Sequence, residues 1–447
     1  MRSFRWLLAK ELRALVASKS FWLFLLVTGV LVGQAFTTSV NLYAEASGIG
    51  GGPAALAQGL NPLEGIVVPT FGAYDIVATL LFPFVVIRLF AGEKQSGELA
   101  LSLQAPAPFS AVVMAKAAAL LVAWIVSGAA GALALVIWHL IGGHLNGAEV
   151  WNAALGHVLR GVLTIGIGAA AGALAASAAS AAIVALTFTI GTWAIDYVAA
   201  ARGGVIAAVS SYTPEAALRT FEQGELRVAT VLVLLTLGAT GVAAAAIWLR
   251  EGEPARRRVA RLVGLAIVSV ALCATFGRMG ASWDVSESRR NSFSRLDEEH
   301  LRTLGQPLTV TVFLAAEDPR LADLERGVLA KLRRTVPDLR VRYAASSRSG
   351  LFEKSGEQYG EIWYQLGRTP DARKEMTRST TEEIVLETIY MLTGTTRPAS
   401  SGEPAYPGYP LARRAPAAPW VFFLGWPVLV AIVWWMIRRP RFLRVQP

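Results

Sequence analysis

The 447-residue sequence has few of the residues that form disulfides, metal sites and soluble surfaces. Cys273 is the only cysteine, which excludes an intrachain disulfide and a metal site built from cysteines. The four histidines, His139, His144, His157 and His300, match no metal-binding spacing, so each is more simply a structural or interfacial residue. Charged residues make up 17% of the chain, against about 25% in soluble proteins. This deficit argues against a purely soluble protein.

Apolar sequence and positive charge are what the chain has in excess. Hydrophobic residues make up 54% of it, its mean hydropathy is +0.46 and its formal net charge is +10. A helix needs roughly 20 apolar residues to cross a bilayer, and eight stretches reach about that length. The third is over-long, so its helix is expected to tilt or to extend into water. The predicted spans are residues 21–40, 72–91, 111–141, 153–176, 178–201, 228–248, 259–281 and 420–437.

The positive charges are distributed unevenly between the two sides of these spans. With the N-terminus in the cytoplasm, the membrane part places 17 Lys and Arg residues inside and five outside. This asymmetry predicts an even number of spans with both termini cytoplasmic. It also favours a break at Ser177–Ser180, because without it Arg256–Arg258 would lie outside. The basic composition therefore indicates membrane topology, and no nucleic acid is expected as a partner.

Residues 282–419, between the seventh and eighth spans, have the composition of a soluble domain. Residues 283–419 hold 20 Lys and Arg against 19 Asp and Glu, and the topology places them outside the cytoplasm. The sequence pattern predicts a small α/β domain over 282–394 and a linker rich in Pro, Ser and Ala over 395–419. The predicted helices are 294–304, 318–335 and 380–392, and the predicted strands are 308–315, 340–344 and 361–366.

The first 20 residues precede every span and have a helical period. The recurring apolar positions are Phe4, Leu7, Leu8, Leu12, Leu15 and Val16. This spacing predicts an amphipathic helix at the membrane interface. Glu11 falls inside the apolar stripe, where a carboxylate is unfavourable unless it is paired. The sequence supports two interpretations of Glu11 equally: it lies at a solvated helix edge, or it forms a salt bridge to a cytoplasmic Lys or Arg.

A polar segment after the second span carries an ordered set of residues. Glu93, Gly97, the leucines at 99, 101 and 103, and Pro106 are followed by Lys116 ten residues later. Together with Lys10-Glu11-Leu12-Arg13, this order resembles the permeases of type-two ABC exporters. The resemblance covers residues 1–250 and implies a six-span permease domain over 21–250. Outside it, the sequence predicts a seventh span within 251–281 and an eighth span with a basic tail over 420–447.

The resemblance implies a transport subunit driven by ATP. In that family two permeases form a dimer, here a homodimer or pseudo-dimer, and separate ATPase subunits dock beneath it and rock the two bundles. No Gly-x-x-x-x-Gly-Lys-Ser/Thr phosphate loop occurs in this sequence, so ATP and Mg are expected on the partner. The chain itself is expected to bind no cofactor or metal and to hold no catalytic residue. The predicted docking surface is Glu93–Leu103, the alternative being an ordinary solvated loop. The residues assigned to ATPase coupling are Glu11, Glu93, Gly97, Glu98, Leu101, Pro106 and Lys116.

Three charged residues fall inside spans near their outer ends. Asp75, Arg160 and Asp196 belong to the second, fourth and fifth spans. Placing a charge at the bilayer centre costs roughly 2.5–3.5 kcal/mol on insertion scales. The three residues either form one ion-paired cluster at an outer gate or extend separately to the interface. Between spans five and six, Tyr212–Leu226 is expected to hold a short outer helix capped at Thr213.

The outer domain carries a second resemblance. Asp284-Val285-Ser286, Asn291–Ser294, Pro307–Phe313 and Thr381-Glu382-Glu383 resemble the gliding-motility-type auxiliary domain of ABC systems. Asn291 stands where that family has an aromatic residue. The match ends near residue 394, whereas family members continue through a further large α/β portion. The resemblance therefore implies a shortened auxiliary domain.

These features predict a mainly α-helical polytopic protein of the bacterial cytoplasmic (inner) membrane. Its expected architecture is a six-span ABC exporter permease bundle, two further spans and a small extracytoplasmic α/β domain. The predicted function is the permease subunit of an ATP-driven exporter, with an ABC ATPase, membrane lipids and an extracytoplasmic protein as partners. The alternative is a non-transporting scaffold that passes ATPase motion to cell-envelope or gliding-motility partners. A membrane enzyme is disfavoured because polar residues in the bundle are sparse and peripheral.

Overall fold

The computed structural model is mostly helical. Within the part of the chain that it describes, eight helices are long and apolar enough to cross a membrane, which fits a multi-pass membrane protein. Each of them overlaps one predicted span. They are Lys19–Ala46, Leu63–Ser96, Phe109–Leu140, Gly147–Leu174, Ala178–Val198, Val228–Trp248, Ala255–Phe276 and Ala418–Arg438. The described residues are 2–49, 60–99, 108–202, 212–250, 252–315, 318–344, 358–367, 372–398, 406–411 and 413–438.

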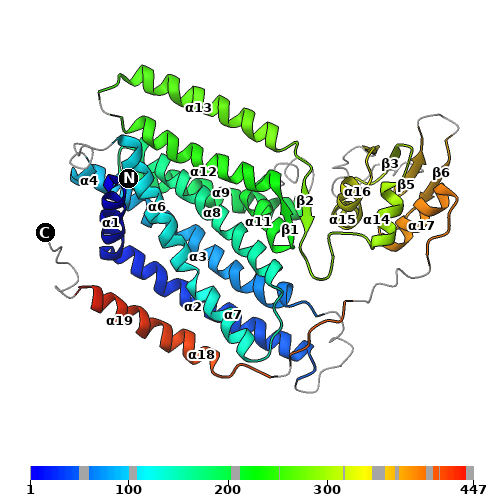
Figure 1. Cartoon of the computed structure of the whole chain (residues 1–447), viewed down its shortest axis with the longest axis horizontal. Coiled ribbons are helices and arrows are strands. Elements are labelled where there is room, and N and C mark those ends of the chain that lie inside the picture. Colours follow the sequence, from blue (N-terminus) through cyan, green and yellow to red (C-terminus); the bar gives the residue numbers. More distant parts are fainter. Residues whose placement is uncertain are drawn as a thin grey trace.

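The helices of the membrane part form one bundle with α8 near its centre. α8 contacts α3, α6, α9, α11 and α12, and about two thirds of the residues in its most apolar stretch are buried. The two spans beyond residue 250 lie at opposite edges of the bundle, α13 against α12 and α19 against α2 (Figure 1). The helical elements are α1 (Arg2–Ala17), α2 (Lys19–Ala46), η2 (Leu63–Val67), α3 (Val68–Ile87), η3 (Arg88–Gly92), α4 (Glu93–Ser96), α6 (Phe109–Ser127), α7 (Ala129–Leu140), α8 (Gly147–Leu174), α9 (Ala178–Arg202), α11 (Pro214–Glu222), α12 (Val228–Trp248), α13 (Ala255–Phe276), α18 (Ala418–Trp420), η5 (Val421–Gly425) and α19 (Trp426–Arg438).

Glycines allow α8 and α12 to approach until their backbones touch. A Cβ atom added at Gly166 on α8 would lie 2.4 Å from the carbonyl oxygen of Gly238 on α12. One added at Gly241 would lie 2.2 Å from the carbonyl oxygen of Gly166. Helices that cannot gain from hydrophobic exclusion of water pack through such small residues. The Gly and Ala content of this part of the sequence is therefore a packing feature.

The break between the fourth and fifth spans lies where the charge asymmetry predicts it. α8 ends at Leu174 and α9 begins at Ala178. The Ser177 hydroxyl accepts a hydrogen bond from the Ser180 backbone N–H, and the Ser180 hydroxyl accepts one from the Ser177 N–H, each at 3.1 Å. This reciprocal pairing satisfies the free donors at the start of α9. The over-long third span is interrupted at Gly128, between α6 and α7.

The α/β domain is a four-stranded sheet with helices packed against it. The strand order is β4-β3-β5-β6, with β3 parallel to β4 and the other pairs antiparallel. Alternate residues of β3, namely Leu308, Val310 and Val312, are fully buried in the core between sheet and helices. The elements are β2 (Ser282–Asp284), α14 (Arg295–Arg302), β3 (Leu308–Val312), α15 (Pro319–Leu324), η4 (Glu325–Leu329), α16 (Ala330–Thr335), β4 (Leu339–Tyr343), β5 (Ile362–Leu366), β6 (Lys374–Thr377) and α17 (Glu382–Thr393).

The three predicted helices and three predicted strands of this domain are confirmed, and two of the strands, β3 and β5, are shorter than predicted. The Ser294 hydroxyl caps α14 by accepting from the Asp297 N–H. Two features were not predicted. β6 adds an edge strand, and β2 pairs antiparallel with β1 (Glu225–Arg227), which follows α11. The short β1–β2 ladder joins the domain to the bundle.

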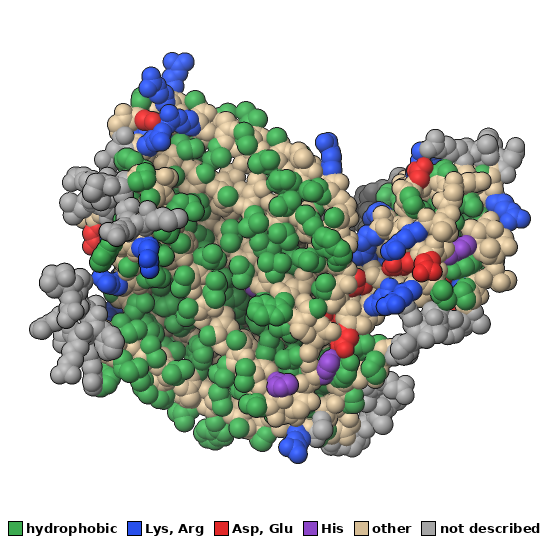
Figure 2. Space-filling model, in the orientation of Figure 1, with side chains coloured by type: hydrophobic (Ala, Val, Ile, Leu, Met, Phe, Trp, Pro, Cys, Tyr) green, Lys and Arg blue, Asp and Glu red, His purple; other side chains and the backbone are tan. Residues whose placement is uncertain are grey.

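The two ends of the bundle differ in what they carry. α1, α4 and the end of α19 lie at one end, here called the α1 end, and the α/β domain lies at the other, here called the domain end (Figure 1). In the view of Figure 2, hydrophobic side chains cover much of the bundle, and the Lys and Arg side chains lie at its edges and on the α/β domain. This distribution suits a protein whose sides face lipid and whose ends face water.

Part of the predicted linker is packed against the bundle. The Tyr409 N–H donates to the Leu60 carbonyl at 3.0 Å, and the Tyr43 hydroxyl donates to the Tyr409 carbonyl at 2.8 Å. The Leu411 N–H donates to the Ser47 hydroxyl at 2.8 Å. These contacts hold the described residues 406–411 at the domain end of α2.

Candidate functional site

A buried ion cluster joins three segments at the α1 end. The Lys116 side chain on α6 is fully buried, and its Nζ lies 2.9 Å from Glu11 Oε2 and 2.6 Å from Glu93 Oε2. Lys10 Nζ lies 3.3 Å from Glu11 Oε1 and 3.8 Å from Glu93 Oε2, with its side chain 45% exposed. Lys10, Glu11, Glu93 and Lys116 are called the Lys116 cluster below. Two ammonium groups face two carboxylates, so the cluster is balanced in charge.

The apolar stripe of α1 is what places Glu11 inside the protein. Leu8, Leu12 and Val16 pack against the main core, and Leu15 is buried in it. Glu11 lies on the same face and is fully buried. Of the two interpretations that the sequence left open, the structure contains the salt bridge.

Burial makes this cluster a rigid connection. Taking charges out of water is costly, so each group depends on its partners, and removing one partner of a buried pair typically costs about 3–5 kcal/mol. Glu11 and Lys116 are 105 residues apart in sequence, and Glu93 and Lys116 are 23 apart. The cluster therefore holds α1, α4 and α6 in one fixed arrangement.

The segment that follows Glu93 returns to the surface. α4 ends at Gly97, whose φ of +82° is left-handed, with open space around it. Before this turn, Lys94 Nζ donates to the carbonyls of Ala173 and Ala175 at 3.1 and 3.0 Å, which satisfies free acceptors at the end of α8. Residues 94–98 are exposed, whereas Leu99 is buried again. Gln95–Glu98 is called the 95–98 surface below.

The predicted docking surface needs one correction. Glu93 was expected on it, but its side chain is 9% exposed and is bonded to Lys116. The physical reason is that the ammonium group of Lys116, buried in the bundle, needs carboxylates around it. Gly97 and Glu98 remain on the surface. Leu101 and Pro106 lie outside the described residues.

A second buried charge cluster lies at the domain end. Arg160 on α8 has its Nε 2.5 Å from Asp75 Oδ1 on α3, and its Nη2 2.8 Å from Glu215 Oε1 on α11. Nη2 also donates to the Thr79 hydroxyl at 3.0 Å. Asp75 and Arg160 are thus brought together, as the ion-pair interpretation expected. Asp196 is not part of this contact, because Arg219 of α11 pairs with it instead.

The sequence reasoning missed the contribution of α11 to this cluster. Glu215 and Glu222 stand seven residues apart, which places both on one helix face together with Leu218. Leu218 and Phe221 are buried, so that face is turned toward the bundle. The amphipathic spacing of α11 was the available signal. It would have predicted that both carboxylates point inward.

Hydrogen bonds fasten the α/β domain to the bundle. The Glu287 carboxylate lies 2.9 Å from His144 Nε2 and accepts from the Tyr409 hydroxyl at 2.6 Å. The Glu287 N–H donates to Glu149 Oε1 at 2.7 Å. Asn291 donates through Nδ2 to the Gln223 carbonyl, which follows α11, at 2.7 Å.

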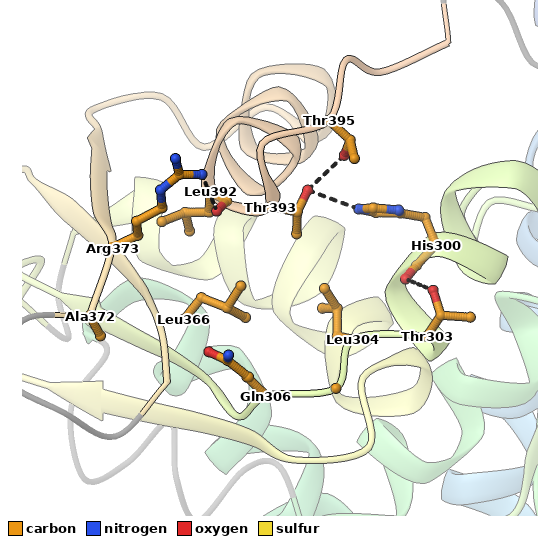
Figure 3. Close-up of a pocket in the computed structure, with 11 residues that line it drawn as sticks. His300, Thr303, Leu304, Gln306, Leu366, Ala372, Arg373, Leu392, Thr393 and Thr395 are labelled. Carbon is orange, nitrogen blue, oxygen red and sulfur yellow. Dashed lines mark hydrogen bonds between the residues drawn. The ribbon is translucent and has the colours of Figure 1, made fainter.

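The α/β domain has an open cavity of about 730 Å³ where α14, α17 and the ends of β5 and β6 meet (Figure 3). The Thr393 hydroxyl lies 3.2 Å from His300 Nε2 and 2.7 Å from the Thr395 hydroxyl, and Arg373 Nη1 lies 3.5 Å from the Leu392 carbonyl. These contacts close the C-terminal end of α17. Burial lowers the pKa of His300, so its ring is neutral near pH 7.

The described part of the chain contains no group of three or more His, Cys, Asp or Glu residues suited to a metal ion. Comparison of the chain with protein-family models, with curated proteins and with solved structures gives no match.

Proposed function

We propose that the chain is the permease subunit of an ATP-driven ABC exporter in a bacterial cytoplasmic membrane. The observation that carries the proposal is the Lys116 cluster. Glu11, Glu93 and Lys116 were selected from the sequence by their place in the permease motif, and they meet in one buried cluster. Residues of the motif that share one role in coupling are expected to be in contact.

The cluster supports a mechanical role in coupling. A force on the 95–98 surface would act directly on α4, because Gln95 and Ser96 belong to that helix. The ion pairs would pass that force to α1 and α6, and Lys94 would pass it to the end of α8. α8 runs through the bundle and carries Arg160 of the domain-end cluster, so motion at the α1 end would reach the domain end. ATP and Mg would bind the separate ATPase subunit.

The charge distribution supports the orientation in this proposal. The α1 end carries the excess of Lys and Arg, which favours the cytoplasmic side. The α/β domain would then be extracytoplasmic, where it could meet a protein partner. α9 presents Ile183, Val184 and Trp193 on its exposed side, a face suited to lipid or to a second permease.

Co-purification of an ATPase tests the proposal. The full-length tagged chain, extracted from its own membranes, is expected to carry a subunit that has the phosphate-loop motif and hydrolyses Mg-ATP. The variant Gly97→Ala is expected to lower the amount of bound ATPase at least several-fold. The reason is that a side chain at φ +82° strains the turn that forms the 95–98 surface.

A matched control separates docking from backbone strain. Gly252 also has a left-handed φ, of +78°, and open space around it, and it lies between α12 and α13 at the same end. Gly252→Ala should therefore leave the bound ATPase unchanged. The proposal fails if no ATP-hydrolysing subunit accompanies the wild-type chain. The docking assignment fails if both glycine variants behave alike.

The scaffold alternative is favoured by one observation, the fixed attachment of the α/β domain through β1–β2 and Glu287. Such an attachment would pass motion of the bundle to an outer partner. Reconstituted complex that hydrolyses ATP and moves no lipid or drug across liposomes would support this alternative over export.

A further inference from the structure

The domain-end cluster contains more carboxylates than cations. Asp75, Glu215 and Glu222 surround one guanidinium, that of Arg160, and their side chains are 15%, 7% and 12% exposed. A second cation nearby, Arg219 on α11, pairs with Asp196. With every carboxyl group ionised, the buried cluster would carry an uncompensated negative charge, which a low-dielectric site strongly disfavours.

The ring of a buried histidine beside this cluster makes no hydrogen bond to any residue that the structure describes. His157 on α8 is 4% exposed, and neither of its ring nitrogens is hydrogen-bonded within the described residues. Its Nε2 lies 3.7 Å from Glu222 Oε1. Phe71 and Tyr74 pack against the ring, with centroids at 5.2 and 5.8 Å. The imidazole is thus aimed at Glu222 from an otherwise aromatic pocket.

We infer that Glu222 and His157 form a buried proton-binding site at the domain end. A proton from solvent on that side converts the Glu222 carboxylate to a carboxylic acid, whose O–H donates to the free Nε2 of a neutral His157. The proton removes one negative charge from the cluster and gives one unpartnered nitrogen its hydrogen bond. The 3.7 Å separation closes to hydrogen-bonding distance through a small side-chain rotation.

The charges around the site agree with proton binding near neutral pH. α3 contributes Asp75, α8 contributes Arg160 beside His157, and α9 contributes Asp196, while α11 itself contributes Glu215 and Arg219. Burial and then the Asp75 charge raise the pKa of Glu222 to about 7, while Arg219 and Arg160 act in the opposite direction. The site therefore holds its proton below neutral pH and releases it above.

This inference goes beyond the proposed transport role and stands without it, since it concerns α11 and the domain end alone. Its consequence is that the pH on the domain side acts on the contact between α11 and the bundle. Deprotonation leaves Glu222 charged next to Asp75, so α11 is held less firmly at alkaline pH.

Infrared pH-difference spectra of the full-length chain in lipid nanodiscs test the site. The wild type should show a carboxylic-acid C=O band that titrates near pH 7, and the band should be absent from Glu222→Gln. Glu45→Gln, which changes an exposed carboxylate at the domain end of α2, should keep the band. His157→Phe preserves an aromatic ring but removes the acceptor, so it should lower the titration midpoint.

A second measurement applies if the carboxyl bands overlap. As the pH is raised from about 5 to about 8, the unfolding temperature of the wild type should fall relative to that of Glu222→Gln. In this range the folded state keeps a proton on Glu222 that the unfolded chain has lost, so raising the pH removes that stabilisation. A band retained in Glu222→Gln, or equal pH dependence of both midpoints, would overturn the inference. So would a shift of the titration when sodium replaces choline, since that result indicates a bound cation instead of a proton.

Discussion

Lys116 lies on a membrane-spanning helix in a position that water does not reach, and two carboxylates from distant segments meet it there. At the scale of single residues, these two carboxylates compensate the charge of the buried ammonium group. The motif order selected Glu11, Glu93 and Lys116 as coupling residues; Lys10, quoted only as part of the N-terminal tetrapeptide, is the fourth member of the cluster. Glu222 and His157 are 65 positions apart and meet only because α11 folds back on α8.

Replacing Lys116 alone should damage the protein more than replacing the whole cluster. Lys116→Met leaves two buried carboxylates with only the exposed Lys10 as partner, so it should destabilise the chain by about 3–5 kcal/mol. Adding Glu11→Gln and Glu93→Gln removes the uncompensated charges and should recover much of the loss. Thermal unfolding of detergent-solubilised protein measures both. Lys19→Met changes an exposed lysine and serves as the control; a triple variant no more stable than the single one would contradict this reasoning.

At the scale of elements, helix length and strand period were readable from the sequence, whereas the contacts between elements were not. The eight spans follow from runs of apolar residues, and the break near Ser177–Ser180 follows from charge asymmetry. The edge strand β6 and the β1–β2 ladder were missed because three or four residues carry too little periodic signal. Their positions are fixed by pairing partners that lie far away in the chain.

The α8–α12 contact gives a prediction about glycine. In Gly166→Ala the new methyl group meets backbone atoms of Gly238, which cannot rotate away, so overpacking should cost about 1–3 kcal/mol. Gly191→Ala on α9 adds the same methyl group with no neighbour within 4 Å, and it should be neutral or slightly stabilising. The thermal midpoints of the two variants should therefore move apart. Equal midpoints would mean that the two helices do not pack as closely as described.

At the scale of the whole molecule, the bundle separates two kinds of surface. The α1 end carries the 95–98 surface, and the domain end carries the α/β domain on its β1–β2 attachment (Figure 1). The uneven distribution of Lys and Arg predicted this division, because charge and span number together determine which loops share a side. The way the α/β domain packs against the bundle could not be predicted from the sequence. It depends on hydrogen bonds between distant residues, such as that from Asn291 to the Gln223 carbonyl.

The central claim is that a separate ATPase docks on the 95–98 surface and moves the helices joined at Lys116. Photo-crosslinking in intact cells tests it most directly, with a photoreactive amino acid at the exposed Gln95 and, as the control, at Met391 on α17, which is 61% exposed. The account predicts that mass spectrometry of the Gln95 adduct identifies an ABC ATPase and that the Met391 adduct contains none. A Gln95 adduct without an ATPase, or an ATPase captured at Met391, would contradict it.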